Sequence, residues 1–228
     1  MSAKLRKKTV IFYHAQCPDG FGGAYAAWKK FKNRAEYRGL TRDQKPPFHI
    51  RGKELYFIDF TYPAPITKEF IRNNKRVIIL DHHKSAEKTA RLAHEYRFAL
   101  DHSGAVLAWR WFHPRARMPL LLRHIEDVDL WRFRLPRSKE FYAWLSSYPF
   151  EFGLWNRLIQ QLERPQGRRR AVMEGAAILR AQNAAVQYFV NNEAVQVRFL
   201  GRTVYAVNSP ELASQIGYAL IQKQPPLS

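Results

Sequence analysis

Three adjacent ionisable residues, Asp81, His82 and His83, follow directly on an apolar segment at Arg76–Leu80. The segment, Arg-Val-Ile-Ile-Leu, is typical of a strand buried on both faces of a parallel sheet. Ionisable groups at the end of a core strand are costly to bury unless a metal ion or a phosphate group compensates for them. The segment therefore indicates both a parallel sheet and a functional site where one of its strands ends.

Two further apolar runs end in ionisable residues in the same way. Val10–Tyr13 runs into His14, with Asp19 in the turn that follows, and Glu54–Ile58 runs into Asp59. Apolar residues recur at helical spacing in four segments between and after these strands, and we predict helices there: Phe21–Phe31, Ala64–Asn74, Glu87–His94 and Ser103–Phe112. This alternation predicts an α/β domain with a mostly parallel sheet flanked by helices. Since ligands bind at the carboxyl ends of parallel strands, we expect these polar residues to share one crevice.

The pattern becomes helical from about Leu120. Helices are predicted at Leu120–Ile125, Lys139–Ser146, Glu151–Leu162, Arg168–Val190 and Glu211–Ile221. Val195–Leu200 and Thr203–Val207 read as a hairpin with its turn at Gly201-Arg202. We predict a catalytic domain at 1–135, a helical connector at 136–192 and a small, incomplete α/β part at 193–228.

The chain has 38 Lys and Arg against 19 Asp and Glu, a formal charge of +19. Such a charge favours a polyanionic partner, nucleic acid above all, although a solvated basic surface is the alternative reading. No apolar run approaches the ~20 residues of a membrane span. The single cysteine, Cys17, excludes an intrachain disulfide. These features predict a cytoplasmic protein without a membrane part.

The residues at the predicted strand ends form a plausible ligand set for divalent metal ions. Imidazole nitrogen and carboxylate oxygen without thiolate suit Mn²⁺ or Mg²⁺ rather than structural zinc. Two ions ~3.5–4 Å apart need a bridging carboxylate and stabilise both the attacking and the leaving oxygen of a phosphoryl displacement. Asp59, at the end of a central strand, is well placed to bridge.

Each of these residues also has an ordinary structural reading. A lone histidine at a strand end is more often a hydrogen-bonded core residue, and Asp59 could cap a turn. Asp127 and Asp129 fit the solvated end of a helix. Only the Asp81-His82-His83 run favours a functional reading by itself.

Together, four ordered segments resemble the motifs of the DHH phosphoesterase superfamily. Leu80–His83 resembles the signature motif of the family, Tyr13–Ala24 its first motif, Phe57–Phe60 its second and Ile125–Trp131 its fourth. Ser103–Trp109 is similar to the helix start, rich in small residues, that follows the third motif. The resemblance covers about residues 9 to 135.

The resemblance implies a role for each residue. His14, Asp19 and Asp59 would hold one metal ion, and Asp59, His82 and Asp127 the other, with Asp129 ranked below Asp127. His83 would face the phosphate as a hydrogen-bond donor or general acid, and Asp81 would orient its neighbouring histidine. Ser103 and Gly104 would contact the substrate.

Three features depart from the family pattern or leave a question open. Phe21 stands where some members carry another acidic residue, and Cys17 could be a metal ligand or a packed thiol. Thr203–Ser209 and Glu211–Leu220 resemble the start of the substrate-binding domain called DHHA1. The Gly-Gly-Gly-His segment expected later in that domain is absent from the sequence.

The resemblance and the charge imply hydrolysis of phosphodiester bonds in short oligonucleotides or related nucleotides. Two alternatives stay open: a pyrophosphatase or phosphomonoesterase, and a nucleic-acid-binding module that has lost turnover. Trp131, Tyr142 and Trp144 lie near basic residues and could stack on bases, although such side chains more often pack between helices. The sequence leaves the oligomeric state open.

Overall fold

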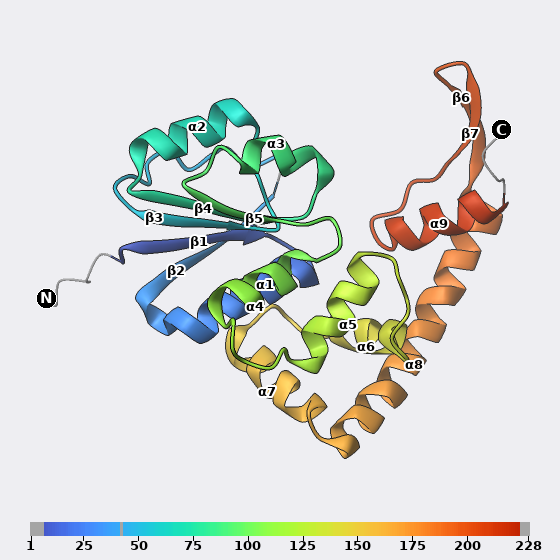
Figure 1. Cartoon of the computed structure of the whole chain (residues 1–228). Helices are drawn as coiled ribbons and strands as arrows, with labels where there is room; N and C mark the ends of the chain where they lie inside the picture. Colours follow the sequence, from blue (N-terminus) through green and yellow to red (C-terminus); the bar gives the residue numbers. More distant parts are fainter. Residues whose placement is uncertain (1–6, 42, 224–228) are drawn as a thin grey trace, which may run out of the picture.

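The structure, a computed structural model, describes residues 7–41 and 43–223. Its centre is a sheet of parallel strands in the order β2-β1-β3-β4-β5 (Figure 1). The strands are β1 (Thr9–His14), β2 (Ala35–Leu40), β3 (Glu54–Ile58), β4 (Arg76–Asp81) and β5 (Glu95–Phe98). Every neighbouring pair is parallel, and helices connect β1 to β2, β3 to β4 and β4 to β5.

Side chains of the central strands alternate between two hydrophobic clusters, one on each face of the sheet. Ile11 packs on one face with α1 (Pro18–Phe31) and α4 (Gly104–Phe112). Val10 and Phe12 pack on the other face, which α2 (Ala64–Asn73) and α3 (Glu87–Ala90) cover (Figure 1). Burial on both faces explains why these strands are continuous apolar runs in the sequence.

The register of the sheet brings three functional positions side by side. Tyr13 pairs with Ile58, and Ile58 pairs with Leu80. The next residues along each strand are His14, Asp59 and Asp81, so they meet at the carboxyl edge of the sheet. The predicted convergence of the strand ends is therefore a direct result of parallel pairing.

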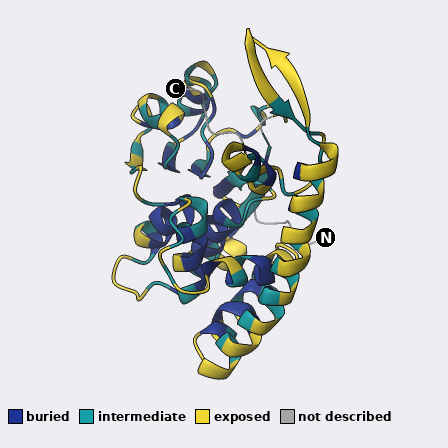
Figure 2. Cartoon of the chain, turned by 90° about the vertical axis from the view of Figure 1, so that its right-hand side faces the viewer, coloured by how far each residue is buried: buried dark blue, intermediate teal, exposed yellow. Residues whose placement is uncertain are grey.

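Helices follow the sheet domain and lead to a small hairpin. They are α5 (Leu120–Asp129), α6 (Ser138–Ser146), α7 (Phe152–Leu162) and α8 (Pro165–Tyr188), which continues into a π-helical turn at Phe189–Glu193. The hairpin β6 (Val195–Phe199) and β7 (Arg202–Ala206) is antiparallel and precedes α9 (Ala213–Lys223). Helix α9 packs on the end of α8 through Val186, Ile216 and Leu220. The hairpin projects from the body and is largely exposed (Figure 2).

The predicted fold class is confirmed, with local differences. Two strands were missed, β2 (Ala-Glu-Tyr-Arg-Gly-Leu) and β5 (Glu-Tyr-Arg-Phe). Both lie at sheet edges, where polar side chains reach solvent and no continuous apolar run is needed. The helix predicted at Glu87–His94 ends at Ala90, and a 3-10 turn at Lys84–Ala86 precedes it. The hairpin turn lies at Leu200-Gly201, one residue earlier than predicted, and both residues have positive φ.

The division at 1–135, 136–192 and 193–228 stays a prediction, and residues 1–6 and 224–228 at its outer ends lie outside the described part. Within the described residues, none of the helices combines the length and apolar character needed to cross a bilayer.

Candidate metal centre

The Asp59 carboxylate lies at the centre of the cluster. Its Oδ2 is 3.4 Å from His14 Nδ1, and its Oδ1 is 3.2 Å from His82 Nε2 and 3.7 Å from His83 Nδ1. The residue is buried and has a φ of +56°, which is unusual for a side chain other than glycine and is typical of a strained functional position. Burial raises the pKa of Asp59, but the close imidazoles of His14 and His82 outweigh burial and lower the pKa. Asp59 is thus an anion shared by three histidines.

Three carboxylates converge on the ring of His82. Its Nε2 lies 3.2 Å from Asp59, 3.5 Å from Asp129 Oδ2 and 3.9 Å from Asp19 Oδ2. Burial lowers the pKa of His82, but the close contact with Asp59 and the negative charges of Asp19 and Asp129 raise this pKa to about 9. So much negative charge around one nitrogen is the electrostatic environment of a cation site.

Asp19 joins this cluster from the start of α1. The carboxylate is buried, and its oxygens accept hydrogen bonds from the backbone N–H groups of Gly104 (2.6 Å) and Ala105 (2.9 Å) at the start of α4. Burial and repulsion by Asp59 and Asp129 raise the pKa of Asp19 well above its usual range. Because a divalent cation would offset this repulsion, the arrangement favours one.

His83 is held by Asp81 rather than by the central carboxylate. Asp81 Oδ1 accepts hydrogen bonds from His83 Nδ1 (2.8 Å) and from the backbone N–H groups of His82 and His83, while Oδ2 accepts one from Thr61. The bond to Asp81 raises the pKa of His83. His83 also lines a cavity of about 470 Å³ beside His14 and Asp59. Asp81 therefore fixes which ring nitrogen of His83 can face that cavity.

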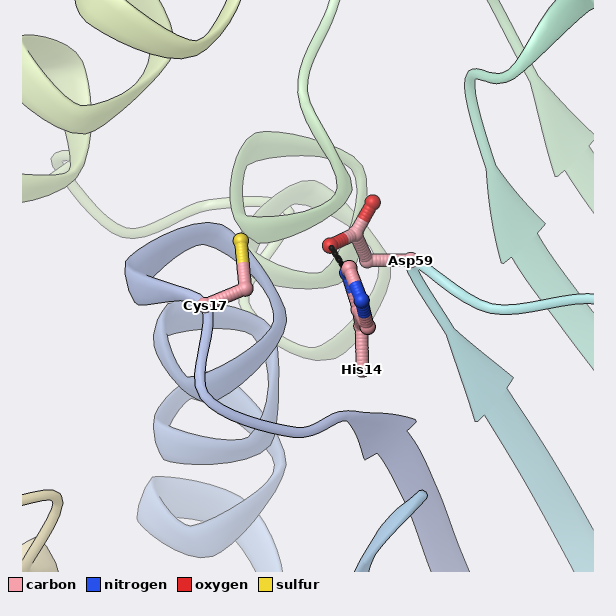
Figure 3. Close-up of side chains that lie close together, drawn as sticks. All are labelled: His14, Cys17 and Asp59. Carbon is pink, nitrogen blue, oxygen red and sulfur yellow. Dashed lines mark ion pairs between the residues drawn. The ribbon is translucent and has the colours of Figure 1, made fainter. Parts of the chain in front are cut away.

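Cys17 lies on the other side of His14, directly before α1. The thiol sulfur, His14 and Asp59 offer ligand atoms within 4.8 Å of one another (Figure 3). Burial, together with the charges of Asp59 and Asp19, raises the pKa of the thiol. Cys17 thus lies within reach of an ion at His14. Because its pKa is raised, the side chain is a neutral thiol when no such ion is bound.

The structure reverses the order in which the sequence ranked Asp127 and Asp129. Asp129 lies in the cluster with Asp19 and His82, whereas Asp127 is absent from the ligand groups found among the described residues. The Asp127 carboxylate accepts hydrogen bonds from Ser138 Oγ (2.6 Å) and from the backbone N–H groups of Arg134 and Leu135. Burial raises the pKa of Asp127, but these bonds outweigh it and lower the pKa. On a helix, side chains two residues apart point to different sides, so only one of the pair can reach the site.

Ser103 and Gly104 have structural roles, and their contact with a substrate stays a prediction. Ser103 is fully buried, and its hydroxyl accepts a hydrogen bond from Val106 N as the N-cap of α4. A Cβ at Gly104 would lie 2.5 Å from that of Asp59 and 2.9 Å from Asp19 Oδ2. The small residue is therefore needed for the close approach of α4 to the two carboxylates.

Phe21, which stands where the family pattern allows an acid, is buried away from the ligand cluster. Its ring stacks on Phe152 at 4.8 Å and meets Trp155 edge-on at 4.8 Å. The position thus belongs to the contact between α1 and α7, and Asp129 supplies the additional carboxylate from α5. The sequence carried that signal only as the second acid of Asp127-Val128-Asp129.

The donor set fits a divalent metal ion. Asp59 Oδ1 and Asp129 Oδ2 are buried oxygens without a hydrogen-bond partner among the described residues. Unsatisfied buried carboxylate oxygens are costly, and metal coordination is a common way to compensate for them. Three overlapping groups can hold an ion: His14, Cys17 and Asp59; Asp59, His82 and His83; and Asp19, His82 and Asp129. The fold and this donor set define an α/β protein with a candidate metal centre at the carboxyl edge of its sheet.

Comparisons with known proteins leave the activity open. No family model matches the chain. An uncharacterized protein of Acanthamoeba polyphaga mimivirus is 28% identical over 239 residues, covering 95% of this chain and 55% of the relative. The chain thus spans about half the length of that curated relative.

Two solved structures are similar to the chain. The crystal structure of an uncharacterized protein from Helicobacter pylori has a TM-score of 0.50 at 12% identity, covering 96% of this chain and 80% of the other. The crystal structure of RecJ in complex with Mn²⁺ from Thermus thermophilus has a TM-score of 0.44 at 16% identity, covering 81% of this chain and 36% of RecJ. At such identity the Helicobacter protein shows a shared fold alone, so the function must be argued from the site.

Proposed function

We propose that this protein is a divalent-metal-dependent phosphoesterase of the DHH type that hydrolyses phosphodiester bonds in short oligonucleotides or related nucleotides. The observation that carries the proposal is the buried Asp59 carboxylate, which is shared by His14, His82 and His83 and has one oxygen without a partner. The ordered motifs from His14 to Asp129 support the same class.

The proposal assigns two ions, Mn²⁺ or Mg²⁺, to overlapping ligand groups. His14 and Asp59 hold one ion, with the Cys17 sulfur in reach, and Asp19, His82 and Asp129 hold the other together with Asp59. Such ions, when bound, neutralise phosphate charge and activate water for attack. In this proposal Asp129 takes the place that the sequence analysis gave to Asp127. The ligand is still a carboxylate, so the proposed chemistry is unchanged.

In the proposed mechanism Asp81 positions His83, and His83 donates a proton to the leaving oxygen. Asp81 holds His83 through Nδ1, which leaves Nε2 as the nitrogen for a substrate oxygen. Because Asp81 raises the pKa of His83, the ring retains a proton that it can donate to the leaving oxygen. The cavity of about 470 Å³ lined by His14, Asp59 and His83 provides space for the phosphate group.

The test is hydrolysis of a panel with Mn²⁺: bis(p-nitrophenyl) phosphate, a dinucleotide, a five-residue RNA, a single-stranded DNA, cyclic di-AMP and pyrophosphate. The wild type should cleave the diesters, and His82→Ala should reduce kcat/KM by more than about 100-fold, since even residues that merely orient metal ligands cost 10–100-fold. His49→Ala, an exposed histidine outside the centre, is the matched control.

Two results would contradict the proposal. If pyrophosphate were cleaved and no diester were, the activity would be that of a pyrophosphatase. If Mn²⁺ bound by calorimetry without turnover of any substrate, the chain would be a binding module.

A further inference from the structure

A second cavity, of about 430 Å³, lies between α6, α8, α9 and the segment that follows α5. We call it the amide pocket, because five of its lining residues carry a side-chain amide: Gln182, Asn183, Gln187, Gln215 and Gln222. Among the described lining residues, Lys139 is the one cation and there is no carboxylate. Charged residues make up 25% of the chain, so the pocket is strongly depleted in charge.

The amides reach the pocket from two facing helices. Gln215, Tyr218, Ala219 and Gln222 follow the i, i+3, i+4, i+7 spacing of one face of α9. Leu179, Gln182, Val186 and Gln187 come from one side of α8. Asn183, Gln187 and Gln215 are exposed, so the donors and acceptors of their side-chain amides are accessible to a ligand.

Aromatic rings line the pocket beside the amides. Trp131 lies 5.1 Å from Phe133 and 5.5 Å from Tyr218, measured between ring centroids, and both Trp131 and Tyr218 are exposed. Trp131 and Phe133 have φ of +54° and +51°, values that bulky side chains rarely adopt. Asp127 holds this segment through Arg134 N and Leu135 N. The carboxylate that fails to reach the metal centre thus positions the aromatic wall.

The pocket adjoins the metal centre. Val128 lines the pocket, and the next residue, Asp129, contacts His82. Tyr142 lines the pocket from α6 and lies close enough to Cys17, Asp129 and Asp19 for their charges to add to burial in raising the pKa of the phenol. A ligand that fills the pocket therefore lies on the Asp129 side of the candidate metal centre.

We propose that the amide pocket binds the nucleobase of a nucleotide whose phosphodiester reaches the metal centre. The inference rests on the proposed function and narrows its substrate to base-bearing diesters. Aromatic faces stack on any base, and amides pair with the donors and acceptors of base edges. A phosphate group would call for several cations, whereas the pocket offers Lys139 alone.

The test compares three variants. Tyr218→Ala removes an exposed ring from the aromatic wall, and Gln187→Leu/Gln215→Leu removes two amides at similar volume. Gln166→Leu, an exposed glutamine near the other end of α8, is the matched control. Binding of adenosine and uridine 5′-monophosphate is measured by calorimetry in EDTA, and kcat/KM with Mn²⁺ is measured for a dinucleotide and for bis(p-nitrophenyl) phosphate, which has no base.

Both pocket variants should weaken nucleotide binding at least about tenfold. They should also lower the ratio of kcat/KM for the dinucleotide to that for the base-free diester by a similar factor. Gln166→Leu should change neither quantity. Loss of nucleotide binding in the variants of a protein without any turnover would support the pocket and refute the proposed hydrolase.

Unchanged nucleotide binding in both pocket variants would overturn the inference. So would an unchanged ratio of kcat/KM for the dinucleotide to that for the base-free diester in both pocket variants, because the pocket would then add nothing to recognition. Binding of a peptide or a second copy of the chain in the pocket, with no nucleotide binding, would overturn it as well.

Discussion

The metal centre and the amide pocket are neighbours, yet opposite kinds of groups form them. In the centre, carboxylates and imidazoles lie within 3–4 Å of one another, and the pKa values of Asp19, Asp59 and His82 are all displaced. The pocket is lined by amides and aromatic rings, with Lys139 as its one charged group among the described residues. Charged groups that interact strongly with one another are typical of an ion site. Neutral amides, which carry both a donor and an acceptor, are suited to recognising the edges of nucleobases.

The two regions also differ in what supports them. The candidate ligands at the centre come from the ends of core strands, the start of α1 and the end of α5, so the sheet fixes most of their positions. The pocket is formed by helices that meet through a small cluster around Val186 and Ile216. We therefore expect changes at the centre to affect chemistry and core packing together, and changes at the pocket to affect recognition with little effect on the core.

Asp59→Asn should show the largest difference between the two regions. The variant should lose Mn²⁺ binding and more than about 100-fold in kcat/KM, because it removes the charge shared by three histidines. Nucleotide monophosphate binding in EDTA should stay within about threefold of wild type, since the pocket contains no contact with Asp59. Calorimetry with each ligand checks both. Loss of nucleotide binding as well would show that the two regions are one site.

Alanine substitutions at two glycines should act in opposite directions. Gly104→Ala places a Cβ 2.5 Å from that of Asp59 and should destabilise the fold by about 1–3 kcal/mol while weakening Mn²⁺ binding. Gly217→Ala on α9 meets nothing within 4 Å and should stabilise the helix by about 0.5–1 kcal/mol. Urea unfolding curves measure both. A Gly104→Ala variant as stable as the wild type would mean that the close approach of α4 to Asp59 is not a constraint.

The neighbouring acids Asp127 and Asp129 offer a finer comparison. Asp127→Asn should cost about 1–2 kcal/mol of stability, because the charged acceptor of Ser138 and two backbone N–H groups is lost. Asp129→Asn should weaken Mn²⁺ binding at least about tenfold without lowering the stability of the metal-free chain. Burial and the charge of Asp59 raise the pKa of Asp129 to about 6, so removing its charge relieves repulsion. The reverse pattern would restore Asp127 as the ligand.

The last prediction concerns pH. Burial, with a lesser contribution from Arg123, lowers the pKa of His124 to about 4 in spite of the nearby Asp127. The unfolded chain binds a proton at His124 below pH ~6.5, and the folded chain binds it only near pH 4. As the pH is lowered from about 6.5 to about 4, the free energy of unfolding should therefore fall by about 1 kcal/mol per pH unit.

His124→Gln keeps a polar side chain beside Ser138 and removes the titration. Urea unfolding from pH 7 to 4.5 should show a shallower decline for this variant than for the wild type. Parallel declines would place the acid sensitivity in the carboxylates of the metal centre.

The parallel sheet and the convergence of most of the candidate ligands could be predicted from the sequence alone. Apolar strands that end in His14, Asp59 and Asp81-His82-His83 can be read from a linear sequence, because a buried strand must be apolar and its ionisable end must be compensated. Parallel pairing then brings those ends to one edge whatever the loops between them. Local sequence gave no such signal for β2 and β5, since edge strands need no apolar run.

Only the tertiary structure decided which acid of α5 faces His82 and where the amides gather. Asp127 and Asp129 are equivalent in sequence, and the packing of α5 and the loop to Ser138 turns Asp129 inward. Glutamines on α8 and α9 read as solvated helix positions until the two helices meet across Trp131 and Tyr218. The physical reason is range: burial and charge at a strand end act on adjacent residues, whereas a pocket between helices exists only after distant faces have packed.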